Sequence, residues 1–275
     1  MRVALFTHHK AGTHWTKYIL SNYINLDLFG SEAGRVDFDN MEESFFPLRL
    51  DYHGFGAHPL GSRLLRQYGI SEIYWAHVSP KRNRGMESID KVAFQCRNLL
   101  DFLVSKFHYD LKRLNLSRGS SENLKVSRPY DLHPKTTLNW CEIVRWMSER
   151  AAEQPSQFQM FHYEDLKSEP VAGFTEMIRF LLTMKPQHDF VVKAVERSTI
   201  GFTREDEKRR GKPIVGHTYT ISDDGRFKGS SFARSGAVRQ YRNYFSQEEI
   251  LSISNLAEKF LPRYLHHLII PKDSS

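Results

Sequence analysis

The sequence is poor in cysteine and has no long apolar run, and both shortages narrow the class of protein. Its 275 residues contain two cysteines, Cys96 and Cys141, without the spacing of a metal site, so we expect reduced thiols and no disulfide framework. No stretch approaches the roughly 20 consecutive apolar residues that span a membrane. The first residues have the pattern of a strand and not of a signal peptide. We therefore expect a cytoplasmic protein without a membrane partner.

The chain also lacks internal repeats and low-complexity tracts, and its length suits one large α/β domain or two small ones. Charge is not balanced: 39 lysines and arginines face 32 acidic residues, for a formal net charge of +7. Such an excess fits an anionic ligand and a nucleic-acid partner equally well. Charge alone does not separate the two.

The beginning of the chain combines a strand, a tight turn and the start of a helix. Val3–Phe6 form a short apolar run without helical spacing, which is typical of a strand buried on both faces of a parallel sheet. Lys10–His14 supply a turn of small residues, and we expect Thr13 to cap the helix that starts near Trp15. Such a turn directs backbone N–H groups and the positive end of a helix dipole at one point. We predict an anion-binding site there.

This turn departs from the phosphate loop of ATP-binding proteins. That loop has the form GxxxxGKS/T, with its lysine after the second glycine and a hydroxyl that holds magnesium. Here Lys10 precedes Gly12, so an ordinary turn with a surface lysine is one alternative. The order instead resembles the 5′-phosphosulfate loop, Pro-Lys-Ser-Gly-Thr-Thr-Trp, of sulfotransferases that use PAPS (3′-phosphoadenosine 5′-phosphosulfate). The resemblance implies that Lys10 acts in catalysis and that the cofactor is bound by Lys10, Ala11, Gly12, Thr13, His14 and Trp15.

A second buried strand is predicted over residues 70–78, and it brings a histidine to the same crevice. The carboxyl ends of parallel strands form the ligand crevice of an open sheet, so His77 is expected to face the Lys10 turn. The family has a catalytic base here, in a His-x-Pro-Pro-like segment that reads His-Val-Ser-Pro in this chain. Imidazole is suited to taking a proton at neutral pH. The resemblance implies that His77 is the general base.

A third strand over residues 91–98 ends in Arg97, and a helix is predicted to follow over residues 99–114. The segment is similar to the family's 3′-phosphate motif, Arg-Asn-Pro-x-Asp-x-x-x-Ser, with Leu99 in place of proline. An arginine at a strand tip offers a planar, permanently charged fork. The resemblance implies that Arg97 and Ser105 bind the 3′-phosphate of the cofactor. The alternative is a core strand and helix with a surface arginine.

Another strand, over residues 158–166, ends on Tyr163–Leu166, which resembles the family's Tyr-Glu-Asp-Leu. There the tyrosine lies near the adenine, so the resemblance implies that Tyr163 and Trp15 sandwich the base. The two carboxylates that follow Tyr163 are interpreted as cap and turn residues before a helix over residues 168–182. We predict no metal.

Two later segments extend the resemblance. Residues 197–202 are similar to the family's Thr-Ser-Phe segment at the nucleotide site, which implies cofactor contacts for Thr199 and Phe202. Farther on, Arg234 and Gly236 match the family's Arg-Lys-Gly, and Ser235 stands in place of the lysine. The resemblance implies that Arg234, Ser235 and Gly236 close over the 3′-phosphate.

The resemblance implies an α/β fold, a P-loop-like three-layer domain whose central parallel sheet is flanked by helices. One domain would cover residues 1–275, with irregular segments at 29–62 and 203–233 that contact the acceptor or form a lid. The implied activity is transfer of the sulfuryl group of PAPS to a hydroxyl or amine of a small-molecule acceptor, which leaves PAP (adenosine 3′,5′-bisphosphate). Two alternatives stay open: a P-loop kinase that uses ATP or GTP, and a non-enzymatic binder of nucleic acid. The sequence indicates neither the acceptor nor the oligomeric state.

Overall fold

The computed structural model describes residues 1–8, 10–41, 45, 48–49, 65–77, 88–118, 127–210, 220–221, 227–228 and 237–270. The chain divides into two compact units. The first unit consists of Met1–Arg97 and Ile143–Thr199, and the second of Asn98–Glu142 and Ile200–Ser275.

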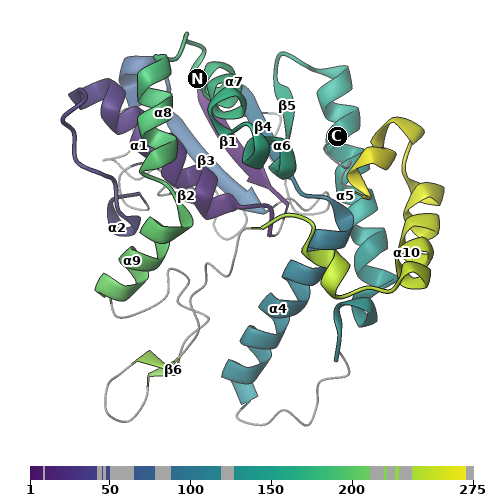
Figure 1. The fold of residues 1–275 in the computed structure, drawn as a ribbon. Helices are drawn as coiled ribbons and strands as arrows, with labels where there is room; N and C mark the ends of the chain where they lie inside the picture. The colour runs from purple at the N-terminus through teal and green to yellow at the C-terminus, as the bar shows by residue number, and fades with distance from the viewer. Residues whose placement is uncertain are drawn as a thin grey trace. The chain divides into compact units, whose positions relative to one another are not determined.

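A parallel sheet of five strands forms the centre of the first unit, in the order β2-β3-β1-β4-β5 (Figure 1). The core positions of its middle strands are apolar and buried, because a strand with neighbours on both sides and helices over its faces has no contact with water. The predicted parallel sheet is confirmed. Its strands are β1 (Arg2–Thr7), β2 (Leu48–Arg49), β3 (Glu72–His77), β4 (Lys91–Cys96) and β5 (Phe158–His162).

The register of the sheet places polar residues at one edge. Thr7, the last residue of β1, lies opposite His77 on β3 and opposite Gln95 on β4. Because all three strands run in the same direction, their carboxyl ends meet at this edge. The loop that follows β1 leaves the sheet from the same place.

Helix α1 (Thr13–Phe29) starts directly after that loop, and Gly30 ends it with a positive φ of 84°. The predicted cap is wrong: Gly12 is the N-cap residue, and Thr13 is already helical. The Thr13 hydroxyl instead shares a hydrogen bond of 2.7 Å with the Thr7 hydroxyl, across the turn. Threonine at this position therefore joins the helix to the strand.

The segment after β5 also differs from the prediction. The strand stops at His162, and Tyr163–Ser168 form a short helix, α6, before α7 (Pro170–Leu182). Glu164 and Asp165 lie in the first turn of α6, where the helix dipole favours negative charge. Pro170 then begins α7, because a proline at the first helical position has no N–H to satisfy.

Two helices of the first unit pack on the sheet and on α1. Helix α7 packs against β4 and β5, and α8 packs against α1 and α7. Helix α8 ends at Glu196. The first unit also contains α2 (Phe38–Asn40) and η2 (Arg66–Tyr68), and α8 spans His188–Glu196.

The second unit is mostly helical. Cys141 on α5 lies beside α10, where its thiol is 4.0 Å from the Ala257 carbonyl oxygen, and Ser246 caps α10 through a reciprocal capping box with Glu249. The unit contains α4 (Leu99–Arg118), η4 (Pro129–Leu132), the first part of α5 (Lys135–Glu153), α9 (Ile200–Arg210), η5 (Gln240–Asn243), α10 (Gln247–Phe260) and η6 (Arg263–Leu268). Two short strands, β6 (Thr220–Ile221) and β7 (Phe227–Lys228), pair antiparallel.

The charged run at the start of segment 203–233 is helical, which contradicts the irregular segment that we expected. It belongs to α9, and its acids Asp206 and Glu207 are buried. Asp206 accepts a hydrogen bond of 3.3 Å from Arg209 on the same helix. A buried acidic residue that is hydrogen-bonded by its neighbours looks the same in the sequence as an acidic residue exposed to solvent. The charge pattern therefore led to the wrong prediction for this segment. Most of segments 29–62 and 203–233 lies outside the described residues.

Both cysteines are buried free thiols, as predicted. Among the described helices, none is long and apolar enough to cross a membrane. No cluster of three or more potential metal ligands occurs in the part of the chain that the structure describes.

Candidate functional site

The loop between β1 and α1 has a backbone that few residues tolerate. Lys10 and Gly12 both have positive φ angles, of 67° and 90°. A Cβ atom on Gly12 would lie 2.6 Å from Cε2 of the Tyr163 ring, so glycine is required here by conformation and by space. The loop delivers the chain directly into the first turn of α1, where backbone N–H groups have no intrahelical partners. This arrangement suits an anion.

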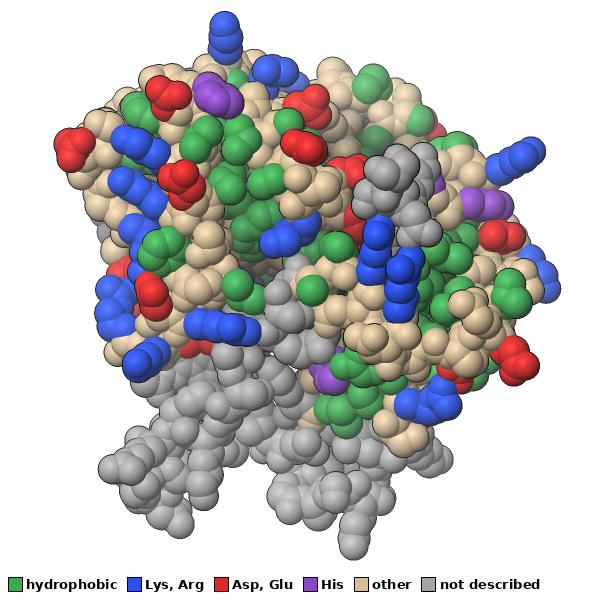
Figure 2. Space-filling view, in the orientation of Figure 1, with side chains coloured by type: hydrophobic (Ala, Val, Ile, Leu, Met, Phe, Trp, Pro, Cys, Tyr) green, Lys and Arg blue, Asp and Glu red, His purple; other side chains and the backbone are tan. Residues whose placement is uncertain are grey.

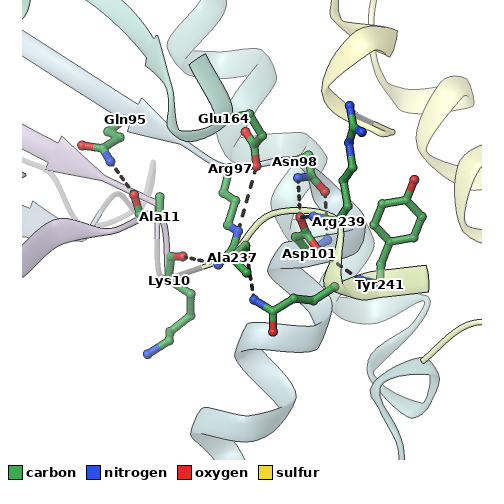
Figure 3. Close-up of polar contacts among 11 residues, drawn as sticks. Lys10, Ala11, Gln95, Arg97, Asn98, Asp101, Glu164, Ala237, Arg239 and Tyr241 are labelled. Atoms are coloured by element: carbon green, nitrogen blue, oxygen red, sulfur yellow. Dashed lines mark hydrogen bonds and ion pairs between the residues drawn. The ribbon is translucent and has the colours of Figure 1, made fainter. Parts of the chain in front are cut away.

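Gln95 on β4 holds this loop in place through hydrogen bonds. Its amide nitrogen donates a hydrogen bond to the Ala11 carbonyl, and its amide oxygen accepts one of 2.6 Å from the Thr16 hydroxyl (Figure 3 shows the first contact). The Gln95 carbonyl accepts a further bond of 2.8 Å from the His8 N–H. Sequence reasoning missed Gln95, although a polar residue in the buried run Lys91–Cys96 was the available signal.

Arg97, one residue beyond β4, contacts the same loop. Its Nη1 donates to the Lys10 carbonyl oxygen at 3.5 Å, and its Nε lies 4.0 Å from Oε1 of Glu164 (Figure 3). The guanidinium carbon lies 4.8 Å from the centre of the Tyr163 ring, and the residue is buried. The structure therefore brings together the two cationic residues that the sequence predicted for opposite ends of one nucleotide.

Trp15 and Tyr163 lie next to each other, but not as the two faces of a sandwich. Their ring centres are 5.9 Å apart and the rings are inclined by 76°, in edge-to-face contact. Trp15 also meets the edge of the buried Phe174, at 5.1 Å and 89°. No base fits between two rings that already touch, so the expected sandwich is corrected to a pair of adjoining rings.

Lys167 is a further cation at this place, and sequence reasoning missed it. Its ammonium lies over the Trp15 ring, 4.8 Å from the ring centre. The Lys167 side chain is exposed, but partial desolvation of its ammonium lowers its pKa, and the positive charge of Arg97 lowers it further. The position directly after the Tyr-Glu-Asp-Leu motif was the only signal in the sequence.

His77 ends β3, half-buried, at the carboxyl edge of the sheet. Its Nδ1 is 3.2 Å from the Thr7 hydroxyl, which in turn shares a hydrogen bond with Thr13. The Trp75 ring meets His77 edge to face at 5.8 Å. Two hydroxyls therefore connect the imidazole to the first residue of α1, and the predicted proximity of His77 to the Lys10 loop holds in the structure. The contribution of Thr7 was not predicted.

His14, predicted as a cofactor ligand, lies among aromatic rings. It stacks on Phe38 at 5.8 Å and 29°, and it is tilted against Trp75 at 6.4 Å. The ammonium of the buried Lys17 lies 4.1 Å from the centre of the Trp75 ring. The His14 side chain thus faces the neighbourhood of Trp75, while its backbone belongs to the start of α1.

Comparison with known proteins agrees with this geometry. The family model described as the sulfotransferase domain matches residues 1–263, which is most of the chain. This chain belongs to the sulfotransferase domain family. It is a PAPS-dependent sulfotransferase, with PAPS as the sulfuryl donor and PAP as the product.

Individual relatives of this sulfotransferase are distant but cover most of its length. Sulfotransferase 1B1 of the dog, Canis lupus familiaris, is 23% identical over 248 residues, which are 89% of this chain and 78% of the relative. Cytosolic sulfotransferase 15 of Arabidopsis thaliana is 21% identical over 271 residues, 93% of this chain and 70% of the relative.

Solved structures share the fold of this sulfotransferase. Mouse sulfotransferase SULT7A1 complexed with PAP has a TM-score of 0.63 at 16% identity and covers 98% of this chain and 86% of its own. Retinol dehydratase in complex with androsterone and PAP has a TM-score of 0.62 at 15% identity, with coverage of 100% and 82%. The predicted P-loop-like α/β fold is confirmed.

The two alternative functions are not favoured. The family match supports neither a P-loop kinase nor a nucleic-acid binder. Figure 2 shows Lys and Arg side chains interspersed with acidic side chains on the face in view.

Several predicted cofactor residues of the sulfotransferase belong to other parts of the chain. Thr199 is exposed at the end of the first unit. In the second unit, Ser105 is half-buried on α4 and Phe202 is half-buried on α9. The predicted ligands Arg234, Ser235 and Gly236 lie outside the described residues.

In the second unit, Asp101 ties the start of α4 to the chain before α10. Its buried carboxylate accepts hydrogen bonds from the backbone N–H groups of Arg239, at 2.5 Å, and Tyr241, at 3.1 Å (Figure 3). The Asn98 side-chain amide donates a third at 3.0 Å. Arg239 has a positive φ of 63°, a conformation that these bonds help to hold. Asp101 matches the aspartate of the 3′-phosphate motif, to which we had assigned no role.

Proposed function

We propose that this sulfotransferase sulfates a hydroxyl or an amine of a small-molecule acceptor in the cytoplasm, with His77 as the general base. The observation that carries the proposal is the hydroxyl chain from His77 through Thr7 to Thr13, which links the imidazole to the anion-binding loop. Solved relatives named for complexes with retinol and with androsterone support a small molecule as acceptor. The name of the Arabidopsis relative supports the location.

The residues of the loop fit the sulfated end of the donor. When bound, PAPS supplies the sulfuryl group and leaves as PAP. Gly12 has no side chain, and a Cβ atom at this position would collide with the Tyr163 ring. The loop can therefore lie against Tyr163 only because residue 12 is glycine. We assign to Lys10 and to the backbone N–H groups of Gly12, Thr13 and His14 the stabilisation of negative charge on the departing phosphate oxygen.

We assign proton removal from the acceptor to His77. The Thr7 hydroxyl engages Nδ1, so Nε2 is the ring nitrogen that we expect to take the proton. The contact also fixes the plane of the ring, which a general base needs if it is to reach the acceptor oxygen or nitrogen. The Trp75 ring adjoins this histidine, His14 adjoins Trp75, and Phe38 stacks on His14; we assign these three rings to the acceptor side.

The nucleotide end of the proposed site starts from Arg97. Its charged fork is assigned to the 3′-phosphate, and the adjoining rings of Trp15 and Tyr163 are assigned to the adenine, which would lie against the pair. The resemblance adds further proposed nucleotide contacts, which remain predictions: Ala11, Ser105, Thr199, Phe202, Arg234, Ser235 and Gly236.

A transfer assay tests the proposal. Purified protein is incubated with PAPS labelled in the sulfuryl group and with a panel of small phenols, alcohols and amines, and labelled products are separated. We expect transfer to at least one acceptor class, and we expect His77→Ala to abolish most of it. Binding of PAP without transfer to any member of a broad panel would contradict a small-molecule acceptor.

A further inference from the structure

Two adjoining rings with a cation over each lie at the proposed nucleotide end of the site. The Lys167 ammonium lies over the Trp15 ring at 4.8 Å, and the Arg97 guanidinium lies over the Tyr163 ring at the same distance. Trp15 and Tyr163 touch each other edge to face. All four residues belong to the first unit, so one compact body carries this arrangement.

The two cations of this arrangement differ in their partners. Arg97 has the Glu164 carboxylate 4.0 Å away and the Lys10 carbonyl at 3.5 Å. Among the residues that the structure describes, Lys167 forms no salt bridge, and its ammonium contacts the face of Trp15. Lys167 is exposed at the surface, and partial desolvation of its ammonium, followed by the charge of Arg97, lowers its pKa, as expected where two cations lie close together. Such a place gains most from an anion.

We propose that Lys167 is a further nucleotide-binding residue of this sulfotransferase, whose ammonium leaves the Trp15 face when adenine takes that face and then contacts the 3′-phosphate beside Arg97. The proposal rests on the proposed site. A long flexible lysine stem can make this exchange, because its head moves while the stem stays on the surface. A phosphate is a stronger partner for an ammonium than a ring face is.

The exchange predicts effects of opposite sign on two nucleotides. Without the ammonium, the Trp15 face is open, which favours any adenine ligand. The contact with the 3′-phosphate is also lost, which disfavours only ligands that carry this group. PAP carries it and 5′-AMP does not, so the pair of ligands separates the two effects.

Calorimetric titration of Lys167→Met and Lys167→Arg with PAP and 5′-AMP is the test. Methionine keeps an apolar stem of similar length, and arginine keeps the charge. For Lys167→Met we expect the Kd of PAP to rise about tenfold, the loss of one charge-assisted hydrogen bond, while the Kd of 5′-AMP stays the same or falls. For Lys167→Arg, the Kd values of both ligands should stay within about threefold of the wild-type values.

Lys185→Met is the matched control, because Lys185 is an exposed lysine of the same unit. It removes the same charge from the surface and should leave both Kd values unchanged. An unchanged Kd of PAP in Lys167→Met, or an equal weakening of PAP and 5′-AMP, would overturn the proposal while PAP binding by the wild type upheld the site. If the wild type bound no PAP, the site and the role of Lys167 would fall together.

Discussion

At the scale of single residues, we expect separable tasks for His77 and Arg97 because they contact the loop in different ways. The histidine reaches the loop through the hydroxyls of Thr7 and Thr13, whereas the arginine contacts the Lys10 carbonyl directly. The first arrangement suits movement of a proton, and the second suits permanent positive charge. Substitutions should therefore separate turnover from nucleotide binding.

Replacement of the histidine should affect turnover alone. For His77→Ala we expect kcat to fall by about 10² or more, the usual scale for loss of a general base, with the Kd of PAP within about twofold of wild type. Steady-state kinetics and calorimetry measure the two quantities. His188→Ala, at the exposed start of α8, is the matched control. Unchanged kcat in His77→Ala would remove this residue from the mechanism.

Replacement of the arginine should affect binding first. For Arg97→Ala we expect the Kd of PAP to rise between about tenfold and 100-fold, because a charged donor to the phosphate is lost, while the Kd of 5′-AMP changes less. Arg97→Lys keeps the charge without the planar fork, so its Kd for PAP should lie between the values of the wild type and Arg97→Ala. Thermal melting checks that each variant is folded. Equal losses for both nucleotides would place Arg97 away from the 3′-phosphate.

At the scale of elements, the turn from β1 into α1 depends on one glycine for two reasons that can be tested apart. Gly12 combines a positive φ with contact to Tyr163, Gly30 has a positive φ with open space around it, and Gly34 has open space without a positive φ. These three positions form a graded series for substitution by alanine.

For Gly12→Ala we expect the free energy of unfolding to fall by about 2–4 kcal/mol, from backbone strain and overpacking, together with loss of PAP binding. Gly30→Ala should lower the free energy of unfolding by about 1 kcal/mol, from backbone strain alone. Gly34→Ala should change the free energy of unfolding by no more than about 0.5 kcal/mol. Urea titration gives all three values. A Gly12→Ala variant as stable as Gly34→Ala would show that the loop does not need glycine.

The start of α4 depends on Asp101 in a similar way. Asp101→Ala leaves the N–H groups of Arg239 and Tyr241 without their acceptor, and we expect the free energy of unfolding to fall by about 3 kcal/mol. Asp101→Asn keeps one acceptor oxygen, so its free energy of unfolding should fall by less. Chemical denaturation measures both, with Asp189→Ala on the exposed face of α8 as control. Loss of stability no greater than in this control would contradict the role of Asp101.

The sequence predicted elements well where one pattern had one physical explanation. A buried parallel strand requires an unbroken apolar run, so the core of β1, β3 and β4 was found within about two residues. Prediction failed at α6 and α9, where polar residues serve a short helix and a buried acid. Those patterns also occur in turns and on solvated surfaces, so only tertiary contacts decide between them.

At the scale of the whole molecule, the candidate site was predictable where its residues lie in contiguous motifs. The proximity of Lys10, His77 and Arg97 was predicted because each lies at or shortly after the end of a strand, at the same edge of the sheet. Gln95, Thr7 and Lys167 were missed because their roles come from neighbours far away in the sequence. The family match extends over both units, and a single functional domain over residues 1–275 stays a prediction.

The central claim is that the Lys10 loop and Arg97 hold opposite ends of one nucleotide without a metal. Calorimetric titration of the wild-type protein with PAP, 5′-AMP and ATP, each in EDTA and in magnesium, tests it most directly. We predict that PAP binds more tightly than 5′-AMP and that magnesium leaves its Kd unchanged, because fixed cations and backbone N–H groups supply the positive charge. Tight binding of ATP that requires magnesium, with no binding of PAP, would contradict the account.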